Sequence, residues 1–200
     1  MTREGEQNMI SSETNLTKQN EQFVTEILQQ NPAYFDKLAK GQSPEYFVLA
    51  CSDSRVSPSV TANMPLGHLF VHRNVANQVV EDDHSFSAGL YYALKYLKVK
   101  NILIEGHTHC GGIQAACEMN QEQEKIQKDD GFHLWISEIQ KNVPSKHVCD
   151  SITSFELSKL NVLNQIENLK KHPVYIKYGT DVEIVGYVFD LSSGKLEKVT

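Results

Sequence analysis

The stretch Tyr46–Arg55, YFVLACSDSR, decides how this chain folds. Its first six residues are apolar without interruption, which is the pattern of a parallel strand buried on both faces. Polar residues follow at once, so we expect Cys51 to stand at the carboxyl end of that strand. In open parallel sheets, ligands bind at this end of the strands. The stretch therefore predicts a central strand, and it predicts that the functional site lies at the carboxyl end of that strand.

Two further apolar runs of strand length lie downstream, at Leu69–His72 and Asn101–Glu105. Between them, residues 85–97 carry apolar side chains three and four positions apart, which is the spacing of a helix. The candidate caps at the start of that helix are Asp82, Asp83 and Ser85. Because strands that alternate with helices require crossover connections, we predict an α/β fold with a mostly parallel central sheet flanked by helices.

The same patterns predict the outer elements. Upstream of the first strand, two short helices are expected from Glu21 onward, separated by Pro32. Downstream we expect helices at 113–119, 132–139 and 152–169, a hydrophilic connection at 121–131, and a last strand at 182–189 followed by a turn. Residues 173–178 alternate like a strand but directly follow a long helix, so strand and helix both stay open there.

The chain has 200 residues, of which 40% are hydrophobic, so it is long enough to bury a core without help from disulfides or ligands. Its first twenty residues are polar and show no periodicity. We therefore predict a polar N-terminal tail or arm at residues 1–20 and a single domain at residues 21–200.

Charge and hydropathy narrow the expected partners and location. There are 19 basic and 25 acidic residues, a net charge of −6, and no run rich in Lys and Arg, so we expect no nucleic-acid partner. The first twenty residues contain no apolar core of signal-peptide length, and no stretch approaches the roughly 18 apolar residues of a membrane span. We predict a cytoplasmic protein without a membrane partner.

The chain contains four cysteines, Cys51, Cys110, Cys117 and Cys149. An intracellular chain of this length has little need of a disulfide framework. We therefore expect these cysteines to bind a metal or to be buried as small apolar side chains.

Cys51 ends the first strand, and His107 and Cys110 follow the third, so two strand ends bring sulfur and nitrogen ligands to one side of the sheet. Two sulfurs and one nitrogen suit Zn²⁺, and three protein ligands leave the fourth tetrahedral position free for water, as in catalytic sites. His109 is an alternative, because it could join the metal or replace His107. Cys117 does not suit a fourth ligand, because seven helical residues place it roughly 10 Å from Cys110.

Asp53 and Arg55 lie directly after the first candidate ligand. The Asp53 carboxylate could bind the metal or accept a proton from a metal-bound water. Arg55 could hold that carboxylate in a bidentate pair and keep it off the metal. The simpler alternative is an ordinary surface ion pair, which stabilises a protein little.

Two glycines, Gly111 and Gly112, follow the last candidate ligand and open a predicted helix. Glycine lets a backbone approach a metal closely, and the first N–H groups of a helix can receive an anion. We predict that this pair binds an anionic substrate, and the alternative is a helix-entry turn without a ligand.

Three segments together resemble the beta-class carbonic anhydrases in order and spacing. They are Ala50–Val56 (ACSDSRV), Leu69–Asn77 (LFVHRNVAN) and Gly106–Gly112 (GHTHCGG). The similarity extends from about Asn20 to Asp190, nearly the whole chain. The combination of Cys-x-Asp-Ser-Arg with His-x-x-Cys is highly specific for this family.

The resemblance implies a lyase that interconverts carbon dioxide and bicarbonate through zinc-bound hydroxide, so the domain at 21–200 is expected to be a zinc-dependent catalytic domain. It implies one Zn²⁺ per chain on Cys51, His107 and Cys110, with His109 only a neighbour. It also implies that Asp53 orients the hydroxide and that Arg55 orients Asp53.

The family architecture adds further expectations. The resemblance implies an antiparallel strand at one edge of the sheet, a short helix at residues 173–178, and a homodimer or higher homo-oligomer formed through the N-terminal helices. A rival function on the same scaffold is hydrolysis of carbonyl sulfide or carbon disulfide. A zinc-binding protein without activity is a third possibility, which the presence of Asp53 and Arg55 disfavours.

Some positions depart from branches of the family. One branch binds a regulatory bicarbonate through a Trp, an Arg and a Tyr, and here Val48 and Phe189 occupy the Trp and Tyr positions while Arg73 remains. The resemblance therefore does not extend to this regulation. In the plant-like branch a Gln beside the site contacts substrate, and this chain has Pro65 there.

Overall fold

The computed structural model describes residues 12–119 and 130–200. The chain divides into two compact units, Met1–Gln42 and Ser43–Thr200. Residues 120–129, which include most of the predicted hydrophilic connection, lie outside the described residues, as do residues 1–11. Among the described residues, no helix is long and apolar enough to cross a membrane.

The first unit consists of helix α1 (Ser12–Gln30) and helix α2 (Tyr34–Leu38). The two predicted helices are confirmed, and Pro32 lies in the break between them because proline disfavours helical continuation of the residue before it. The predicted domain division placed residues 12–20 in a polar tail or arm, and in the structure these residues form the first part of α1. Its assignment of residues 21–200 to one catalytic domain stays a prediction.

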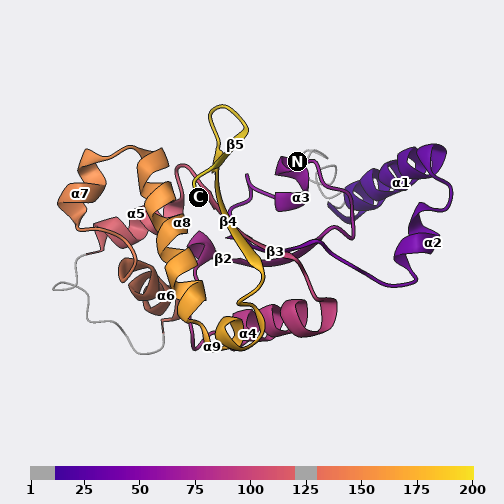
Figure 1. Cartoon of the computed structure of the whole chain (residues 1–200). Helices are drawn as coiled ribbons and strands as arrows, with labels where there is room; N and C mark the ends of the chain where they lie inside the picture. Colours follow the sequence, from indigo (N-terminus) through magenta and orange to yellow (C-terminus); the bar gives the residue numbers. More distant parts are fainter. Residues whose placement is uncertain (1–11, 120–129) are drawn as a thin grey trace, which may run out of the picture. The chain divides into compact units, whose positions relative to one another are not determined.

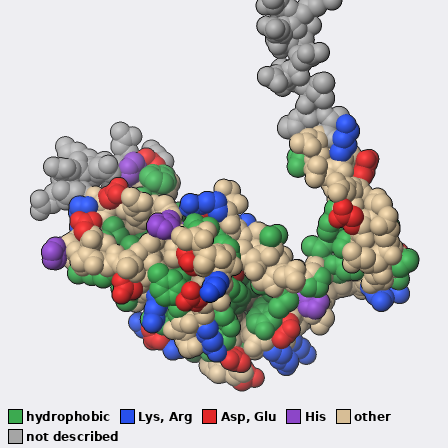
Figure 2. Space-filling view, turned by 90° about the horizontal axis from the view of Figure 1, so that it is seen from above, with side chains coloured by type: hydrophobic (Ala, Val, Ile, Leu, Met, Phe, Trp, Pro, Cys, Tyr) green, Lys and Arg blue, Asp and Glu red, His purple; other side chains and the backbone are tan. Residues whose placement is uncertain are grey.

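The helices of the first unit contact each other through Phe23 and Phe35, whose ring centroids are 6.2 Å apart. No described side chain from residue 15 to residue 42 is buried, and Figure 2 shows hydrophobic side chains on the surface of this unit. Among its large apolar side chains that the structure describes, Leu16 (72%), Phe23 (40%) and Leu28 (36%) are exposed. This pair of helices therefore has no core of its own.

The second unit is built on a five-stranded sheet in the order β2-β1-β3-β4-β5, visible in Figure 1. The first four strands are parallel and β5 pairs antiparallel with β4, so the predicted fold class is confirmed. The strand bounds are β1 Tyr46–Cys51, β2 Leu69–Asn74, β3 Asn101–His107, β4 Glu183–Asp190 and β5 Lys195–Lys198.

The remaining elements of this unit are helical. They are α3 Pro58–Thr61, the 3-10 turn η2 Val75–Asn77, α4 His84–Tyr91, the π-helix η3 Tyr92–Leu97, α5 Gly111–Glu118, α6 Gly131–Gln140, α7 Lys146–Ser151, α8 Ser154–Lys171 and α9 Pro173–Tyr178. Residues 173–178 are thus a short helix, as the family resemblance implied. The sequence patterns missed α3 and α7, because helices of four and six residues are too short to show periodicity.

The strands differ in how deeply they are buried. β1 is buried along its length after Tyr46, as expected for a strand covered on both faces. The strand predicted at Leu69–His72 is confirmed as β2, but β2 lies at the sheet edge and, unlike β1, has no buried residue. Val71, for example, is 39% exposed.

The main core lies on the face of the sheet covered by α4, α8 and α9. Helix α8 lies along β3 and β4 (Figure 1), and two glycines permit this close approach. A Cβ atom at Gly106 would lie 2.6 Å from Val162 Cγ2, and one at Gly186 would lie 2.8 Å from Val162 Cγ1. The contact brings the first turn of α8 to the carboxyl end of β3.

The cysteine expectation needs a correction. Cys51 and Cys110 are free and buried, as predicted, but Cys117 and Cys149 form a disulfide between α5 and α7. The two residues are 32 positions apart, and α7 was not predicted, so the sequence offered no sign that they meet.

A buried histidine caps the start of α9. The Nδ1 atom of His172 accepts a hydrogen bond from Val174 N at 3.2 Å, and its Nε2 atom lies 3.2 Å from Ser87 Oγ. The side chain packs edge-on against the Phe86 ring. Burial lowers the pKa of His172 below its ordinary value, because the charged form loses water and the attraction of the Glu81 carboxylate offsets only part of this loss.

This capping histidine makes stability depend on pH. The unfolded chain binds a proton at residue 172 at pH values where the folded chain does not, so stability is expected to fall as the pH drops below about 6.5. His172→Asn keeps a capping side chain that does not titrate, so the urea midpoint of this variant should change less between pH 7 and pH 5. His172→Ala should lose about 1 kcal/mol at pH 7.5 through loss of the cap.

Circular dichroism during urea titration gives the unfolding midpoints of the unaltered chain and of both variants. Some pH dependence should remain in the Asn variant, because burial also lowers the pKa of His72. If the urea midpoint of His172→Asn changes between pH 7 and pH 5 as much as that of the unaltered chain, His172 is not the source of this pH dependence.

Candidate metal centre

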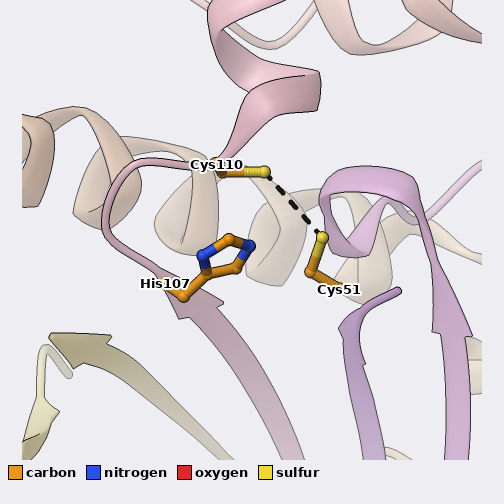
Figure 3. A group of neighbouring side chains, drawn as sticks. All are labelled: Cys51, His107 and Cys110. Carbon is orange, nitrogen blue, oxygen red and sulfur yellow. Dashed lines mark hydrogen bonds between the residues drawn. The ribbon is translucent and has the colours of Figure 1, made fainter. Parts of the chain in front are cut away.

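Three predicted ligands meet at the carboxyl ends of adjacent strands. Cys51 is the last residue of β1, His107 is the last residue of β3, and Cys110 is the N-cap of α5. β1 and β3 pair in parallel, so their ends lie side by side. One ligand atom from each of the three residues lies within 4.8 Å of the other two, and Figure 3 shows the side chains facing one another.

The imidazole of His107 is oriented as a ligand. Its Nδ1 atom lies 2.9 Å from the carbonyl oxygen of Thr108, so Nδ1 carries the proton and Nε2 has a free lone pair. His107 is 1% exposed, and its Nε2 atom is buried without a hydrogen-bond partner. A buried nitrogen lone pair is costly to leave unmatched, so this atom requires a partner such as a metal ion.

The two sulfur atoms are coupled. Cys51 Sγ lies 3.9 Å from Cys110 Sγ and accepts a hydrogen bond from Ala76 N at 3.3 Å. The hydrogen bond from the Cys110 thiol is the main cause that lowers the pKa of Cys51 to about 4. The same contact, with burial, raises the pKa of Cys110, because a second thiolate would face the first. A cation between the sulfurs allows both to be thiolates.

The donor set fits zinc. Two thiolates and one imidazole suit a borderline-soft ion and do not suit Mg²⁺ or Ca²⁺, which take oxygen ligands. His109 is exposed, has a positive φ of 56°, and is not part of the three-residue group, so His107 is the candidate ligand of the two. Cys117 is in a disulfide. Among the described side chains, no fourth His, Cys, Asp or Glu joins the group.

Asp53 and Arg55 form a bidentate pair beside these ligands. Arg55 Nε donates to Asp53 Oδ1 at 2.9 Å, and Arg55 Nη2 donates to Oδ2 at 2.7 Å. The backbone N–H of Arg55 also donates to Oδ1. The Arg55 hydrogen bonds hold the pKa of Asp53 well below its usual range. Asp53 Oδ2 lies 3.9 Å from His107 Nε2, so the ionised carboxylate borders the ligand set.

A family model described as carbonic anhydrase matches residues 46–196. The chain belongs to the beta-class carbonic anhydrases. These are lyases whose general reaction is the hydration of carbon dioxide, and they use zinc.

Individual members of the family match over nearly the whole chain. A carbonic anhydrase of Candida albicans is 32% identical over 204 residues, which cover 95% of this chain and 70% of that protein. One of two tetrameric beta-carbonic anhydrases from Sordaria macrospora superposes with a TM-score of 0.80 at 31% identity, covering 93% of this chain and 95% of that chain. The Coccomyxa beta-carbonic anhydrase, solved in complex with acetazolamide, gives 0.81 at 28% identity, covering 94% and 86%.

Arg73 holds the loop that carries Cys51 and Asp53 in this family member. Its Nε donates to Cys51 O at 2.8 Å, and its Nη2 donates to Asp53 O at 2.8 Å and Val56 O at 2.7 Å. The sequence singled out Arg73 only as a remnant of a regulatory motif. Its side chain is instead engaged with three backbone carbonyl groups, which fixes the loop between β1 and α3.

Two serines on α8 hold the loop of the other two ligands. Ser158 Oγ donates to His107 O at 2.7 Å, and Ser154 Oγ accepts a hydrogen bond from His109 N at 2.5 Å. The sequence reasoning missed both residues. Their only signal was a place in the first turns of a predicted helix, where serine is common for many reasons.

The glycine pair has unequal roles. A Cβ atom at Gly112 would lie 2.5 Å from Val75 Cγ1, so Gly112 lets α5 pack closely against η2. A Cβ atom at Gly111 would meet no atom within 4 Å. Packing therefore explains Gly112, whereas the predicted anion-binding role of both glycines stays a prediction.

The two histidines of the motif form a matched pair for testing the ligand set. His107→Asn removes a ligand, so its zinc affinity should fall by more than the about 10- to 100-fold typical of losing an outer partner of a metal site. His109→Asn should retain zinc, because Asn tolerates the positive φ at this exposed position. Competition with a chromogenic zinc chelator measures both affinities. Equal losses in the two variants would contradict the assignment of His107.

Proposed function

We propose that this chain is a zinc-dependent carbonate dehydratase that interconverts carbon dioxide and bicarbonate. Cys51, His107 and Cys110 would hold one zinc ion, and Asp53 and Arg55 would be the catalytic residues. The observation that carries the proposal is the unpartnered, buried Nε2 atom of His107, which faces two sulfur atoms and lies beside an ionised carboxylate.

Zinc, when bound, lowers the pKa of its water to about 7, so that hydroxide is available as a nucleophile at neutral pH. The protein's contribution is orientation. Because its pKa is held low, Asp53 is ionised at neutral pH and can only accept hydrogen bonds. Placed beside the ligand set, it would accept the O–H of the attacking group and so aim that group's lone pair at carbon dioxide.

Arg55 keeps Asp53 in this position in two ways. It binds both carboxylate oxygens, and its Nη2 also donates to His109 O at 3.1 Å, which ties the Cys51–Asp53 loop to the His107–Cys110 loop. Within this proposal, the N–H groups at Gly111 and Gly112 would receive the bicarbonate anion at the start of α5.

The central test is the rate of carbon dioxide hydration by the zinc-loaded chain and by Asp53→Asn. The amide would still approach Arg55 but can donate as well as accept, so the attacking group loses its fixed orientation. We expect the rate to fall on the order of 100- to 10,000-fold. Stopped-flow measurement with a pH indicator gives the rate directly.

Asp181→Asn is the matched control, because Asp181 is an exposed acid that no described hydrogen bond joins to the site. It should hydrate carbon dioxide at the rate of the unaltered chain. If the zinc-loaded, unaltered chain shows no hydration between pH 7 and 9, the proposal is wrong, and carbonyl sulfide and carbon disulfide become the substrates to try.

We also propose that the chain forms a homodimer or a higher homo-oligomer. The helices of residues 15–42 have no buried side chain, and β2 presents an exposed sheet edge, so both have surface to cover. The Sordaria macrospora relatives are tetrameric. Light scattering on the purified chain should give a mass of two or more protomers at micromolar concentration, and a monomer would contradict this. The cytoplasmic location stays a prediction.

A further inference from the structure

The disulfide between Cys117 and Cys149 lines a cavity that is also lined by Cys110 of the candidate metal centre. The cavity has a volume of about 240 Å³. One wall comes from α5 and includes Cys110 and Cys117, and the opposite wall comes from α7 and α8 and includes Cys149, Ser154 and Ser158. The disulfide is therefore a covalent link between two walls that both reach the metal loop.

On the α5 side, Cys117 and a proposed zinc ligand belong to the same short helix. Cys110 is the N-cap of α5, and its carbonyl oxygen accepts a hydrogen bond from Gln114 N at 3.0 Å. Cys117 is the seventh residue of this eight-residue helix and is 9% exposed. A constraint on Cys117 is thus a constraint on the helix that begins at Cys110.

On the other side, the chain after Cys149 returns to the same loop. Four residues separate Cys149 in α7 from Ser154, the first residue of α8, whose Oγ accepts from His109 N. One turn further along, Ser158 donates to His107 O. The disulfide therefore closes a ring of bonds that runs from the metal loop through α5, across the sulfur atoms, and back through α7 and α8.

Helix α7 has little else to hold it. None of its six residues is buried. Its described side-chain bonds are local: Lys146 pairs with Asp150, Ser151 donates to Val148 O, and Cys149 Sγ lies 3.4 Å from Pro144 O. Within residues 12–119 and 130–200, no hydrogen bond or ion pair that we find joins an α7 side chain to α5 or α8. Among the described side chains, the disulfide is therefore the bond that joins this helix to α5.

We propose that the Cys117–Cys149 disulfide is a redox-sensitive site, opened by a dithiol reductant, that controls how firmly the metal loop is held. We take Cys149 as the sulfur that is attacked, since Cys149 is partly exposed and lies between exposed residues whereas Cys117 is buried. Attack of one thiolate on Cys149 Sγ breaks the disulfide and releases Cys117, which takes up a proton. The second thiol of the reductant then resolves the mixed disulfide and releases Cys149. Two electrons and two protons pass from the dithiol to the protein.

The dithiol form also fits the fold, because Pro144 O lies within reach of a Cys149 thiol proton. In a reducing compartment such as the predicted cytoplasm, disulfides are transient and serve catalysis or sensing. The inference rests on the proposed function only in taking the loop at His107 and Cys110 to hold zinc.

The experiment compares the zinc-loaded chain in its oxidised and dithiol forms with the double variant Cys117→Ser/Cys149→Ser. Mixtures of reduced and oxidised dithiothreitol set the redox state, and differential alkylation with mass spectrometry reports it at each cysteine. Two readouts follow that do not depend on activity. They are amide hydrogen exchange in residues 145–153 and the rate at which zinc passes to a chelator.

Reduction should speed amide exchange in residues 145–153 on the order of tenfold or more, because the constraint on α7 is removed. Zinc should also pass to the chelator faster. The double variant should match the dithiol form in both readouts and should not respond further to dithiothreitol, which controls for an action of the reagent on zinc itself. Equal exchange and equal zinc transfer in the two forms would overturn the inference, as would a pair that never oxidises.

Carbon dioxide hydration is measured separately on the same samples. Redox-dependent exchange and zinc transfer in a chain that does not hydrate carbon dioxide would leave this inference standing and remove the proposed function. If the chain hydrates carbon dioxide but neither amide exchange nor zinc transfer depends on the redox state, the proposed function stands and this inference is overturned.

Discussion

The parallel pairing of β1 with β3 is the constraint on which the site depends. It places Ala50 beside Glu105, so the residues that follow in the two strands lie side by side at the carboxyl end of the sheet. Cys51 and His107 meet there because both strands end there. The sheet must bury apolar side chains on both faces of β1, and that burial fixes the register that brings the ligands together.

The candidate ligands also need loops that are held in place. Two arginines hold the loop that follows β1. Arg73 binds three carbonyl groups at and just after the end of β1, and Arg55 binds Asp53 and the carbonyl group of His109. Guanidinium groups suit this role, because their planar donors form several directed hydrogen bonds at once. The carboxylate beside the ligands is consequently ionised and fixed in orientation.

The second loop is held by helix packing. Glycine at positions 106 and 186 lets α8 lie close to β3 and β4, and this brings Ser154 and Ser158 to the backbone around His107. Helix α5 begins at Cys110, and Gly112 lets it approach η2. The disulfide joins α5 to α7, the helix that directly precedes α8. The metal loop is thus enclosed by packing, hydrogen bonds and one covalent bond.

The sequence by itself determined the central strands and the family, and it predicted the candidate ligands and the Asp53–Arg55 pair, because an unbroken apolar run and two short motifs are local features. Only the tertiary structure decided the rest. It placed β2 at an edge, engaged Arg73 with backbone carbonyl groups, brought the two serines of α8 to the loop of His107 and Cys110, and paired Cys117 with Cys149. Each of these depends on which residues distant in sequence come into contact, and burial and hydrogen bonding settle such contacts only when the whole chain is packed.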